Sequence, residues 1–351
     1  MTAHATSDDA RRRPPGMTDV ARLAGVSQKT VSRVVNNERY VSEAVREKVL
    51  AAAAELGFRP NTAARALITG RFKRIGVVSL GSALYGPASM LVALERATRA
   101  AGLSFMVANT PEGQPEAIQD SVDWLLAQGV DGIILSEPID EGQQVRPDAG
   151  VPIVGLGQAA DLPAERVALA RGRTAASCRE AVEHLLDLGH ERVWHVAGPL
   201  DWWEARERLE GWAEAHRARG IEAPPHLEGD WTPAGGHAAG LALPSEATAV
   251  FCANDDTAIG LARALHEAGR RVPEDVSLVG FDDIPAAAYL SPPLTTVRQD
   301  FEGDATHALN VLMRLLPGAA PEPEARAAAP RRPLVVRSST APPTSSHLSP
   351  P

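Results

Sequence analysis

The sequence predicts an α/β protein in two parts: a small all-helical module near the N-terminus, then a larger two-lobed core of doubly wound parallel sheets. Three observations lead to this prediction. Apolar residues recur at helical spacing through residues 17–57, between helix-start and helix-stop signals. From Arg74 onward, short apolar runs alternate with helical stretches, as in βαβ units. Finally, 351 residues are too many for one ordinary domain.

The helical module contains a helix-turn-helix. Its first helix follows Thr18 and ends at Gly25, because glycine readily adopts the left-handed conformation that closes helices. Ser27 caps the second helix, 28–35, whose valines form a buried stripe. A third helix begins after Ser42 and completes a three-helix core. Two helices joined by a glycine-containing turn are the signature of this motif.

In a helix-turn-helix, the first residues of the second helix meet base edges in the major groove, where hydrogen-bond donors are needed. The module offers neutral and cationic polar side chains in and around that helix. The predicted DNA-binding residues here are Thr18, Ser27, Gln28, Lys29, Thr30, Ser32, Arg33, Asn36 and Tyr40.

Charge is divided unequally along the chain. The net charge is -9, but residues 1–74 hold 14 Lys and Arg against 7 Asp and Glu, a net +7, which leaves 21 against 37, a net -16, for the remainder. A basic N-terminal part followed by an acidic remainder fits a polyanion-binding module joined to one that binds no polyanion. Cys178 and Cys252 lack metal-type spacing and indicate a reduced, cytoplasmic protein. No apolar run predicts a membrane span, and residues 1–16 are expected to be a disordered extension.

A short basic arm follows the helical module. Residues 61–72 are expected to form a hinge helix and linker, and the capped segment 60–67 is too short to be a stable helix alone in water. It therefore needs a partner on which to fold.

The stretches GVSQKTVSRVVN, YVSEAVREKVLAAAAELGFRPN and AARALITGR closely resemble the headpiece and hinge of the lactose-repressor (LacI/GalR-type) family of bacterial transcription regulators, nearest to its lactose/galactoside branch. The resemblance implies that the hinge helices of two subunits pair on DNA and push a leucine into the minor groove. That role falls to Leu67, with Asn61 and Ala64 as further DNA-binding candidates. An apolar wedge of this kind unstacks a base step and kinks the duplex.

The remainder of the chain reads as two similar series of strands and helices. The first has expected strands at 75–80, 103–108, 132–136 and 151–156, with helices at 88–101 and 115–128. The second has expected helices at 174–188, 204–219 and 256–268, with strands at 193–197, 249–252 and 277–280. Two such halves imply two lobes with a cleft, and ligands of open α/β sheets bind beyond the carboxyl ends of the strands.

Polar residues follow three of these strands. Asn254 and Asp255, Asp282 and Asp283, and residues 199–206 lie where each strand ends. Each set has a structural alternative, since Asn and Asp also cap helices and form turns. Three strand ends that converge nevertheless favour a ligand site.

The family resemblance extends over this core, most clearly in EHLLDLGHERVWHVAGP, FCANDDTAIGLARALHEAGRRVPEDVSLVGFDD and YLSPPLTTVRQDF. It implies a periplasmic-binding-protein-like core that senses a small molecule, commonly a sugar. The predicted effector-binding residues are Pro87, Asp201, Trp202, Arg206, Trp231, Asn254, Asp282 and Phe301. Arg and Asp can bind neighbouring hydroxyls, and aromatic faces pack on apolar sugar surfaces. Of the adjacent Trp202 and Trp203, one is expected to line the pocket and the other to pack inward, unless both are core.

Two departures from the family leave the sugar open. Gly157 stands where lactose-type members place an aspartate, and Arg173-Thr174 stands where many relatives show Asp-Asn or Asp-Gln. Arg173 keeps a phosphorylated or acidic sugar among the candidates. The Ala/Pro/Ser-rich end of the chain lacks the heptads of a tetramerisation helix, so a homodimer is expected.

Other signals are weaker. Residues 155–160 match a loose dinucleotide fingerprint, but Pro163 follows instead of a helix, so NAD binding is not expected. His184, His190 and His195 have no metal-site spacing, and no nucleophile lies beside a base, so we expect no cofactor, no metal site and no enzymatic activity.

The sequence therefore predicts a DNA-binding domain at 17–60, a hinge at 61–72, an effector-binding and dimerisation domain of two interleaved lobes at 73–340, and a disordered tail at 341–351. The predicted function is a sequence-specific transcription regulator, a repressor of carbohydrate genes released from a near-palindromic operator by a sugar. A corepressor-dependent regulator remains an alternative within this reading. A solute-binding protein is a more distant one, against which the basic module and the absent signal peptide argue.

Overall fold

The computed structural model describes residues 14–36, 38, 40–59, 70–110, 116–136, 150–157, 167–169, 174–316 and 332–344. The chain divides into two compact units, one ending at Phe72 and the other beginning at Lys73. Each unit has its own buried apolar clusters.

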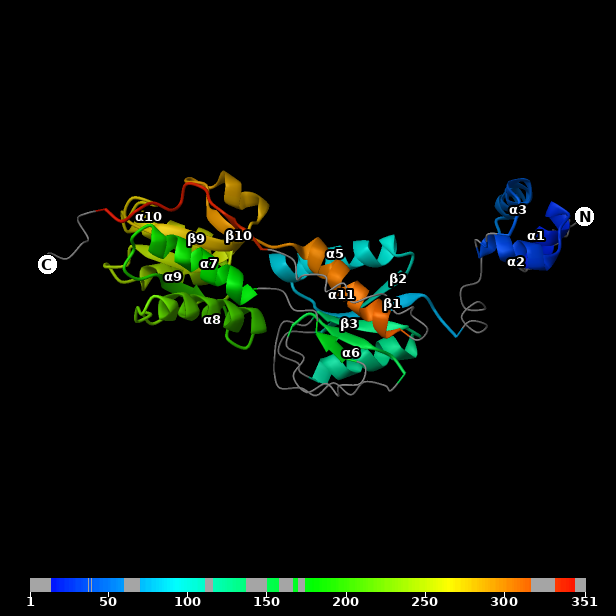
Figure 1. Cartoon of the computed structure of the whole chain (residues 1–351), viewed down its shortest axis with the longest axis horizontal. Helices are drawn as coiled ribbons and strands as arrows, with labels where there is room; N and C mark the ends of the chain where they lie inside the picture. Colours follow the sequence, from blue (N-terminus) through cyan, green and yellow to red (C-terminus); the bar gives the residue numbers. More distant parts are fainter. Residues whose placement is uncertain are drawn as a thin grey trace, which may run out of the picture. The chain divides into compact units, whose positions relative to one another are not determined.

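The first unit is the predicted three-helix module, which is confirmed. It consists of α1 (Met17–Ala24), α2 (Gln28–Val35) and α3 (Glu43–Leu56) (Figure 1). Gly25 and Gly57 close α1 and α3 with φ angles of 67° and 63°, in the left-handed region that favours glycine. Ser27 Oγ accepts a hydrogen bond from the Thr30 amide at 3.1 Å and so caps α2. Residues 61–69 of the predicted hinge, with Asn61, Ala64 and Leu67, lie outside the described residues.

The second unit contains two sheets, as predicted. The first lobe has a wholly parallel sheet in the order β2-β1-β3-β4-β5. Its strands are β1 (Arg74–Leu80), β2 (Ser104–Thr110), β3 (Gly132–Ser136), β4 (Ile153–Gly155) and β5 (Val167–Leu169). Around this sheet lie α5 (Tyr85–Ala100), α6 (Glu116–Ala127) and α11 (Phe301–Leu315). The buried run through β1 explains its position between two partners, since a strand covered on both faces is apolar throughout.

The second lobe has a sheet in the order β11-β10-β9-β8-β6-β7, parallel except for β11, which runs antiparallel to β10. Its strands are β6 (Trp194–Ala197), β7 (Leu227–Glu228), β8 (Ala249–Cys252), β9 (Ser277–Asp282), β10 (Thr295–Arg298) and β11 (Leu334–Val335). Its helices are α7 (Thr174–Asp187), α8 (Trp203–Ala218), α9 (Pro233–Leu241) and α10 (Asp255–Glu267), with a 3-10 turn at Pro285–Tyr289.

The two lobes are interleaved along the chain. Helix α11 follows strand β10 of the second lobe, yet it packs against α5, β3 and β4 of the first (Figure 1). The chain then returns to the second lobe as β11. It therefore crosses between the lobes three times: before α7, before α11 and before β11.

The end of the core differs from the prediction. Ala341 was assigned to the disordered tail, but its amide donates to Ser277 Oγ at 3.0 Å, and its carbonyl accepts a hydrogen bond from the same hydroxyl at 2.9 Å. The assignment of Ala341 to a tail is wrong, because these bonds attach it to the start of β9. None of the helices in the described part of the chain combines the length and hydropathy that crossing a bilayer requires.

Candidate functional site

The helical module exposes polar side chains at the start of α2. Gln28 and Lys29 are exposed, as are Thr18 and Asn36, and Tyr40 is 92% exposed. Arg33 pairs with Glu38 at 3.6 Å, and both side chains are nearly half exposed. An exposed ion pair of this kind contributes only about 0–1 kcal/mol, so Arg33 can exchange it for a DNA contact.

Four of the predicted DNA-binding residues also have local structural partners. Ser27 and Thr30 join their hydroxyls at 2.9 Å, in addition to the cap that Ser27 makes. Ser32 Oγ accepts a hydrogen bond from Asn36 Nδ2 at 3.4 Å at the end of α2. These bonds hold the helix ends, and they leave Gln28 and Lys29 as the side chains that project from the first turn.

A pocket lies between the two lobes of the second unit, where the carboxyl ends of the strands face each other. From the first lobe it is lined by Leu84, Tyr85, Gly86, Pro87, Met90, Ser136, Leu156, Phe301 and Asp304. From the second lobe and the crossover segments it is lined by Thr174, Trp202, Trp203, Glu204, Arg208, Trp231, Asn254, Asp282, Gln299 and Arg332. The pocket thus contains six of the eight predicted effector-binding residues: Pro87, Trp202, Trp231, Asn254, Asp282 and Phe301.

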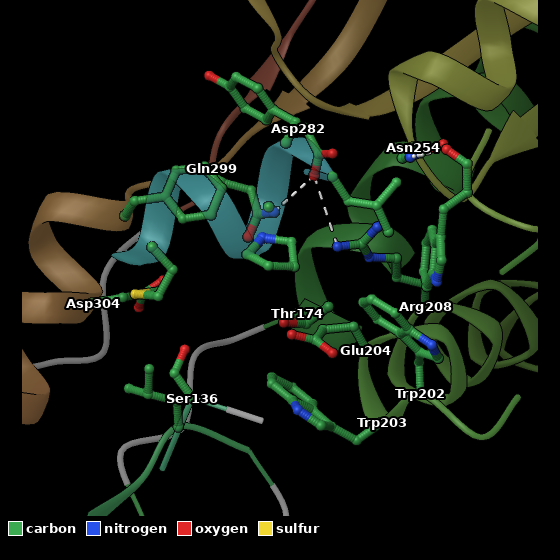
Figure 2. A pocket seen from close by; sticks show the side chains of 18 of the residues that line it. Ser136, Thr174, Trp202, Trp203, Glu204, Arg208, Asn254, Asp282, Gln299 and Asp304 are labelled. Carbon is green, nitrogen blue, oxygen red and sulfur yellow. Dashed lines mark hydrogen bonds and ion pairs between the residues drawn. The ribbon is translucent and has the colours of Figure 1, made fainter. Parts of the chain in front are cut away.

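Asp282 lies at the centre of the second lobe's wall. Its Oδ1 accepts a hydrogen bond from Gln299 Nε2 at 2.7 Å and lies 3.7 Å from Arg208 Nη2 (Figure 2). Burial raises the pKa of Asp282 to about 6, although Arg208 and Gln299 act in the opposite direction. Asp282 and Asp283 have φ angles of 116° and 54°, and such conformations cost roughly 1–3 kcal/mol each in a non-glycine residue. Strain of this size at the end of β9 is typical of functional sites.

Two of the predicted effector-binding residues, Arg206 and Asp201, lie outside the pocket wall. Arg206 was predicted to bind the effector, but its Nη1 donates to the carbonyls of Leu200 and Asp201 at 2.8 and 3.3 Å, and it does not line the pocket. Arg208 lines it instead, because two residues of helix rotate a side chain by about 200°. Asp201, also predicted, is exposed ahead of α8 and lies outside the pocket wall.

Arg208 is held by several groups at once. Its Nη1 donates to the carbonyl of Ala253, and its guanidinium lies 4.1 Å from the ring centre of Phe281 and 5.1 Å from that of Trp231. A signal for Arg208 was present in the sequence. This arginine shares the buried face of α8 with Ala205, Gly211, Trp212, Ala215 and His216, so its helical phase already indicates an inward-facing cation.

Asn254 serves both roles that the sequence left open. Its Oδ1 accepts a hydrogen bond from the Thr257 amide at 2.9 Å, which caps α10, and its Nδ2 donates to the Trp231 carbonyl at 2.9 Å. Asp255 is fully buried and accepts hydrogen bonds from the Ile284 amide and the Thr296 hydroxyl. Asp255 is therefore a structural residue that joins α10 to β9 and β10.

Three indole rings contribute to the wall. Trp202 and Trp231 are each 5% exposed, with ring centres 5.4 Å apart. Both Trp202 and Trp203 line the pocket, and Trp202 also packs inward in an apolar cluster with Leu80, Ala205 and Ala253. A Cβ at Gly157 would overlap the indole nitrogen of Trp203, so Trp203 reaches across to the first lobe at the position where the family aspartate is missing.

Sequence reasoning missed the charged groups on the crossover side of the pocket. Arg332 Nη2 donates to Asp304 Oδ2 at 2.8 Å, and its Nη1 donates to Thr174 Oγ1. Glu204, in the first turn of α8, has a buried Oε2 with no hydrogen-bond partner among the described residues. Burial raises the pKa of Glu204 to about 7, while Arg208 and Arg332 act to lower it.

Two family signatures match the chain. "Bacterial regulatory proteins, lacI family" covers residues 16–61, and "Periplasmic binding protein-like domain" covers residues 182–340. The first spans the helix-turn-helix, and the second spans most of the second lobe together with α11.

Whole-chain relatives agree with these signatures. The chain is 36% identical to the Lactose operon repressor of Escherichia coli strain K12 over 314 residues, which is 88% of this chain and 86% of that protein. It is also 36% identical over 329 residues to the HTH-type transcriptional regulator CelR of Thermobifida fusca, which is 89% of this chain and 95% of that protein.

Solved structures give the same result. The Lac repressor dimer bound to operator and the anti-inducer ONPF matches with a TM-score of 0.77 at 33% identity, covering 94% of this chain and 100% of that chain. The CelR-cellobiose complex matches with a TM-score of 0.65 at 32% identity, covering 93% and 99%. With a matching helix-turn-helix, a matching core and relatives of this identity over most of its length, the chain belongs to the LacI family of bacterial regulatory proteins.

Proposed function

We propose that the chain is a sequence-specific, dimeric transcription repressor that a small sugar releases from a near-palindromic DNA operator. One observation carries the proposal: a donor-rich helix-turn-helix and a pocket lined by three indoles and several buried polar groups occur on one chain. The first can read DNA, and the second can sense a small molecule. The whole-chain similarity to an operon repressor supports the DNA role, and the similarity to a complex with cellobiose supports a saccharide.

The chemistry of the pocket wall suits a polyhydroxylated ring. Indole faces pack on the apolar faces of sugars, while Asp282, Glu204 and Arg208 offer acceptors and donors to hydroxyls at the ring edge. Because the pocket is formed by both lobes, a ligand that contacts both can favour one relative orientation of the lobes. It changes DNA affinity only to the extent that it binds the two orientations differently.

We assign DNA reading to Gln28, Lys29 and Arg33, and the hinge role to Leu67, as the family resemblance implies. Two headpieces would occupy the two half-sites of a palindrome, one helical turn or a multiple of it apart. A DNA-binding repressor acts where the chromosome is, so we place it in the cytoplasm.

The proposal is tested by a fluorescence-anisotropy titration of the full chain onto DNA from around its own gene, at fixed salt. Each titration is run with and without cellobiose, lactose, ribose and glucose. Tight binding that one sugar weakens supports the proposal. A sugar that strengthens binding would make the protein corepressor-dependent, and the absence of any specific DNA binding would contradict the regulator assignment.

A further inference from the structure

The charges of the pocket wall are unequal. Among the described lining residues, Glu204, Asp282 and Asp304 supply three carboxyl groups, and Arg208 and Arg332 supply two guanidinium groups. Asp282 lies opposite Arg208, and Asp304 lies opposite Arg332. The third carboxyl, that of Glu204, has no cation of its own in this arrangement.

Both arginines are already engaged by the protein. Arg332 uses its two terminal nitrogens on Thr174 and Asp304, and only 6% of its side chain is exposed. Arg208 is equally buried, donates to the Ala253 carbonyl and lies against the rings of Phe281 and Trp231. A phosphate or carboxylate is bound strongly when a guanidinium presents two parallel N–H groups to it. The Nε of each arginine is buried and has no acceptor among the described residues, so a parallel N–H pair would have to combine it with a terminal nitrogen that is already directed at a protein group.

Unlike the terminal nitrogens of the two arginines, one carboxylate oxygen of Glu204 is not engaged by a described protein group. Its Oε2 is buried and has no hydrogen-bond partner among the described residues. Figure 2 shows its side chain entering the pocket near Thr174 and Trp203. A buried acceptor that lacks a donor carries an uncompensated desolvation cost, and a ligand that donates a hydrogen bond to this atom would remove that cost. A sugar hydroxyl is such a donor, and a phosphate dianion is not.

We propose that the pocket takes an uncharged saccharide, and that Glu204 is a specificity-determining residue that accepts a hydrogen bond from a ligand hydroxyl and rejects phosphorylated or carboxylated sugars. The inference rests on the proposed role of this pocket as the effector site. It decides between the uncharged and the acidic sugars that the sequence left open.

The shape of the wall supports the same ligand. Trp203 occupies the space that a side chain at position 157 would need, which leaves an indole where the family places a carboxylate. Trp202 and Trp231 extend the aromatic surface. An uncharged ring has an apolar face for such a surface, and an anionic substituent would lose its hydration there in a pocket whose two guanidinium groups already face carboxylates.

The test is isothermal titration calorimetry of the full chain with matched probes. The first set is glucose, glucose 6-phosphate and glucuronate, and the second is cellobiose and cellobionate. We expect an uncharged member to bind at least about ten-fold more tightly than its anionic counterparts. Glu204→Gln should weaken binding of the uncharged sugar by about five-fold, since a neutral acceptor makes a weaker hydrogen bond than a carboxylate. It should also reduce the ratio between the affinity for the uncharged sugar and the affinity for its anionic counterparts.

Glu210→Gln is the matched control. Glu210 lies on the same helix but is exposed and pairs with Arg217 at 2.9 Å, so its replacement should leave every affinity unchanged. Glu204→Asp is a second variant, which keeps the charge and should keep the rejection of anions. Thermal melts of all three variants confirm that each is folded.

Several outcomes would overturn the inference. A phosphorylated or carboxylated sugar that binds more tightly than its parent contradicts it, and so does a Glu204→Gln variant that retains both affinities and discrimination. If no probe binds at all, a saccharide is the wrong class. Titration of DNA with the same preparation separates this failure from that of the proposed function. If a sugar phosphate weakens DNA binding, the regulator assignment stands and the proposal of an uncharged ligand is wrong.

Discussion

Replacing Arg208 by methionine should destabilise the second unit far more than the same replacement at Arg206. Arg208 is buried, faces Asp282 and lies over an aromatic ring, so its loss leaves a buried carboxyl with Gln299 as its remaining side-chain partner. Breaking a buried pair from one side costs about 3–5 kcal/mol. Methionine recovers roughly 1 kcal/mol by packing against the rings. The net loss is then about 2–4 kcal/mol.

Arg206 provides the matched comparison. It donates to two backbone carbonyls near the start of α8. Its replacement should cost about 1 kcal/mol or less, the usual net contribution of such hydrogen bonds. The two changes are chemically identical and two residues apart, so any difference between them reports burial and pairing.

Calorimetric melts of the two variants and the wild type give the measurement. At about 2–4 °C per kcal/mol for a unit of this size, Arg208→Met should lower Tm by roughly 4–16 °C. The defect should shrink at pH 5, because protonation of Asp282, whose pKa is about 6 in the intact pocket, removes the orphaned charge. Equal melting temperatures, or a larger loss for Arg206→Met, would refute the placement of Arg208 in the pocket.

Three further predictions concern DNA, the wall and pH. Arg33→Ala should weaken specific DNA binding by roughly 1–3 kcal/mol in an anisotropy titration, and an unchanged affinity would show that Arg33 makes no base contact. Gly157→Asp should displace the Trp203 indole, shift the tryptophan emission and weaken sugar binding; an unaltered spectrum would mean that the ring does not pack there. Affinity for an uncharged sugar should rise between pH 6 and pH 8. The pKa of Glu204 is about 7, and a hydrogen bond from the ligand favours the carboxylate, so binding releases a proton. If the pH dependence of the sugar affinity, measured by calorimetry, is unchanged in Glu204→Gln, another titratable group causes it.

The helical module was predictable because its signals are local. A serine cap and two left-handed glycines fix where its helices begin and end, and each acts within a few residues of itself. The core strands were predictable for a related reason, since a strand buried on both faces is apolar without interruption. Helix α9 was missed. Its sequence PAGGHAAGL has almost no amphipathic pattern, because it packs on α10 by close approach, and a Cβ at Gly236 or Gly260 would overlap backbone of the other helix.

The pocket was predictable only in part. Residues that directly follow strands, such as Asn254 and Asp282, were found because parallel strands end at one edge of a sheet. Arg208 lines the pocket in place of the predicted Arg206 because it shares the helical phase of the buried residues Ala205 and Trp212. The contact between Gly157 and Trp203, and that between Arg332 and Thr174, joins residues far apart in the sequence. No local pattern encodes such pairs, since they depend on how the two lobes meet.

Arg332 connects the pocket to the segments that cross between the lobes. Thr174 begins α7, directly after the first crossover between the lobes, and Asp304 lies in the first turn of α11, after the second crossover. Arg332 lies at the end of the third crossover, just before β11. Because Thr174 belongs to the second lobe and Asp304 to the first, a rotation that separates them must break one of these two hydrogen bonds. The same three side chains line the pocket, so a ligand there contacts the groups whose spacing changes when the lobes move. An effector response requires a ligand that binds two lobe orientations with different affinities. Contacts of a ligand with Thr174, Asp304 and Arg332 would depend on the lobe orientation and so would provide that difference.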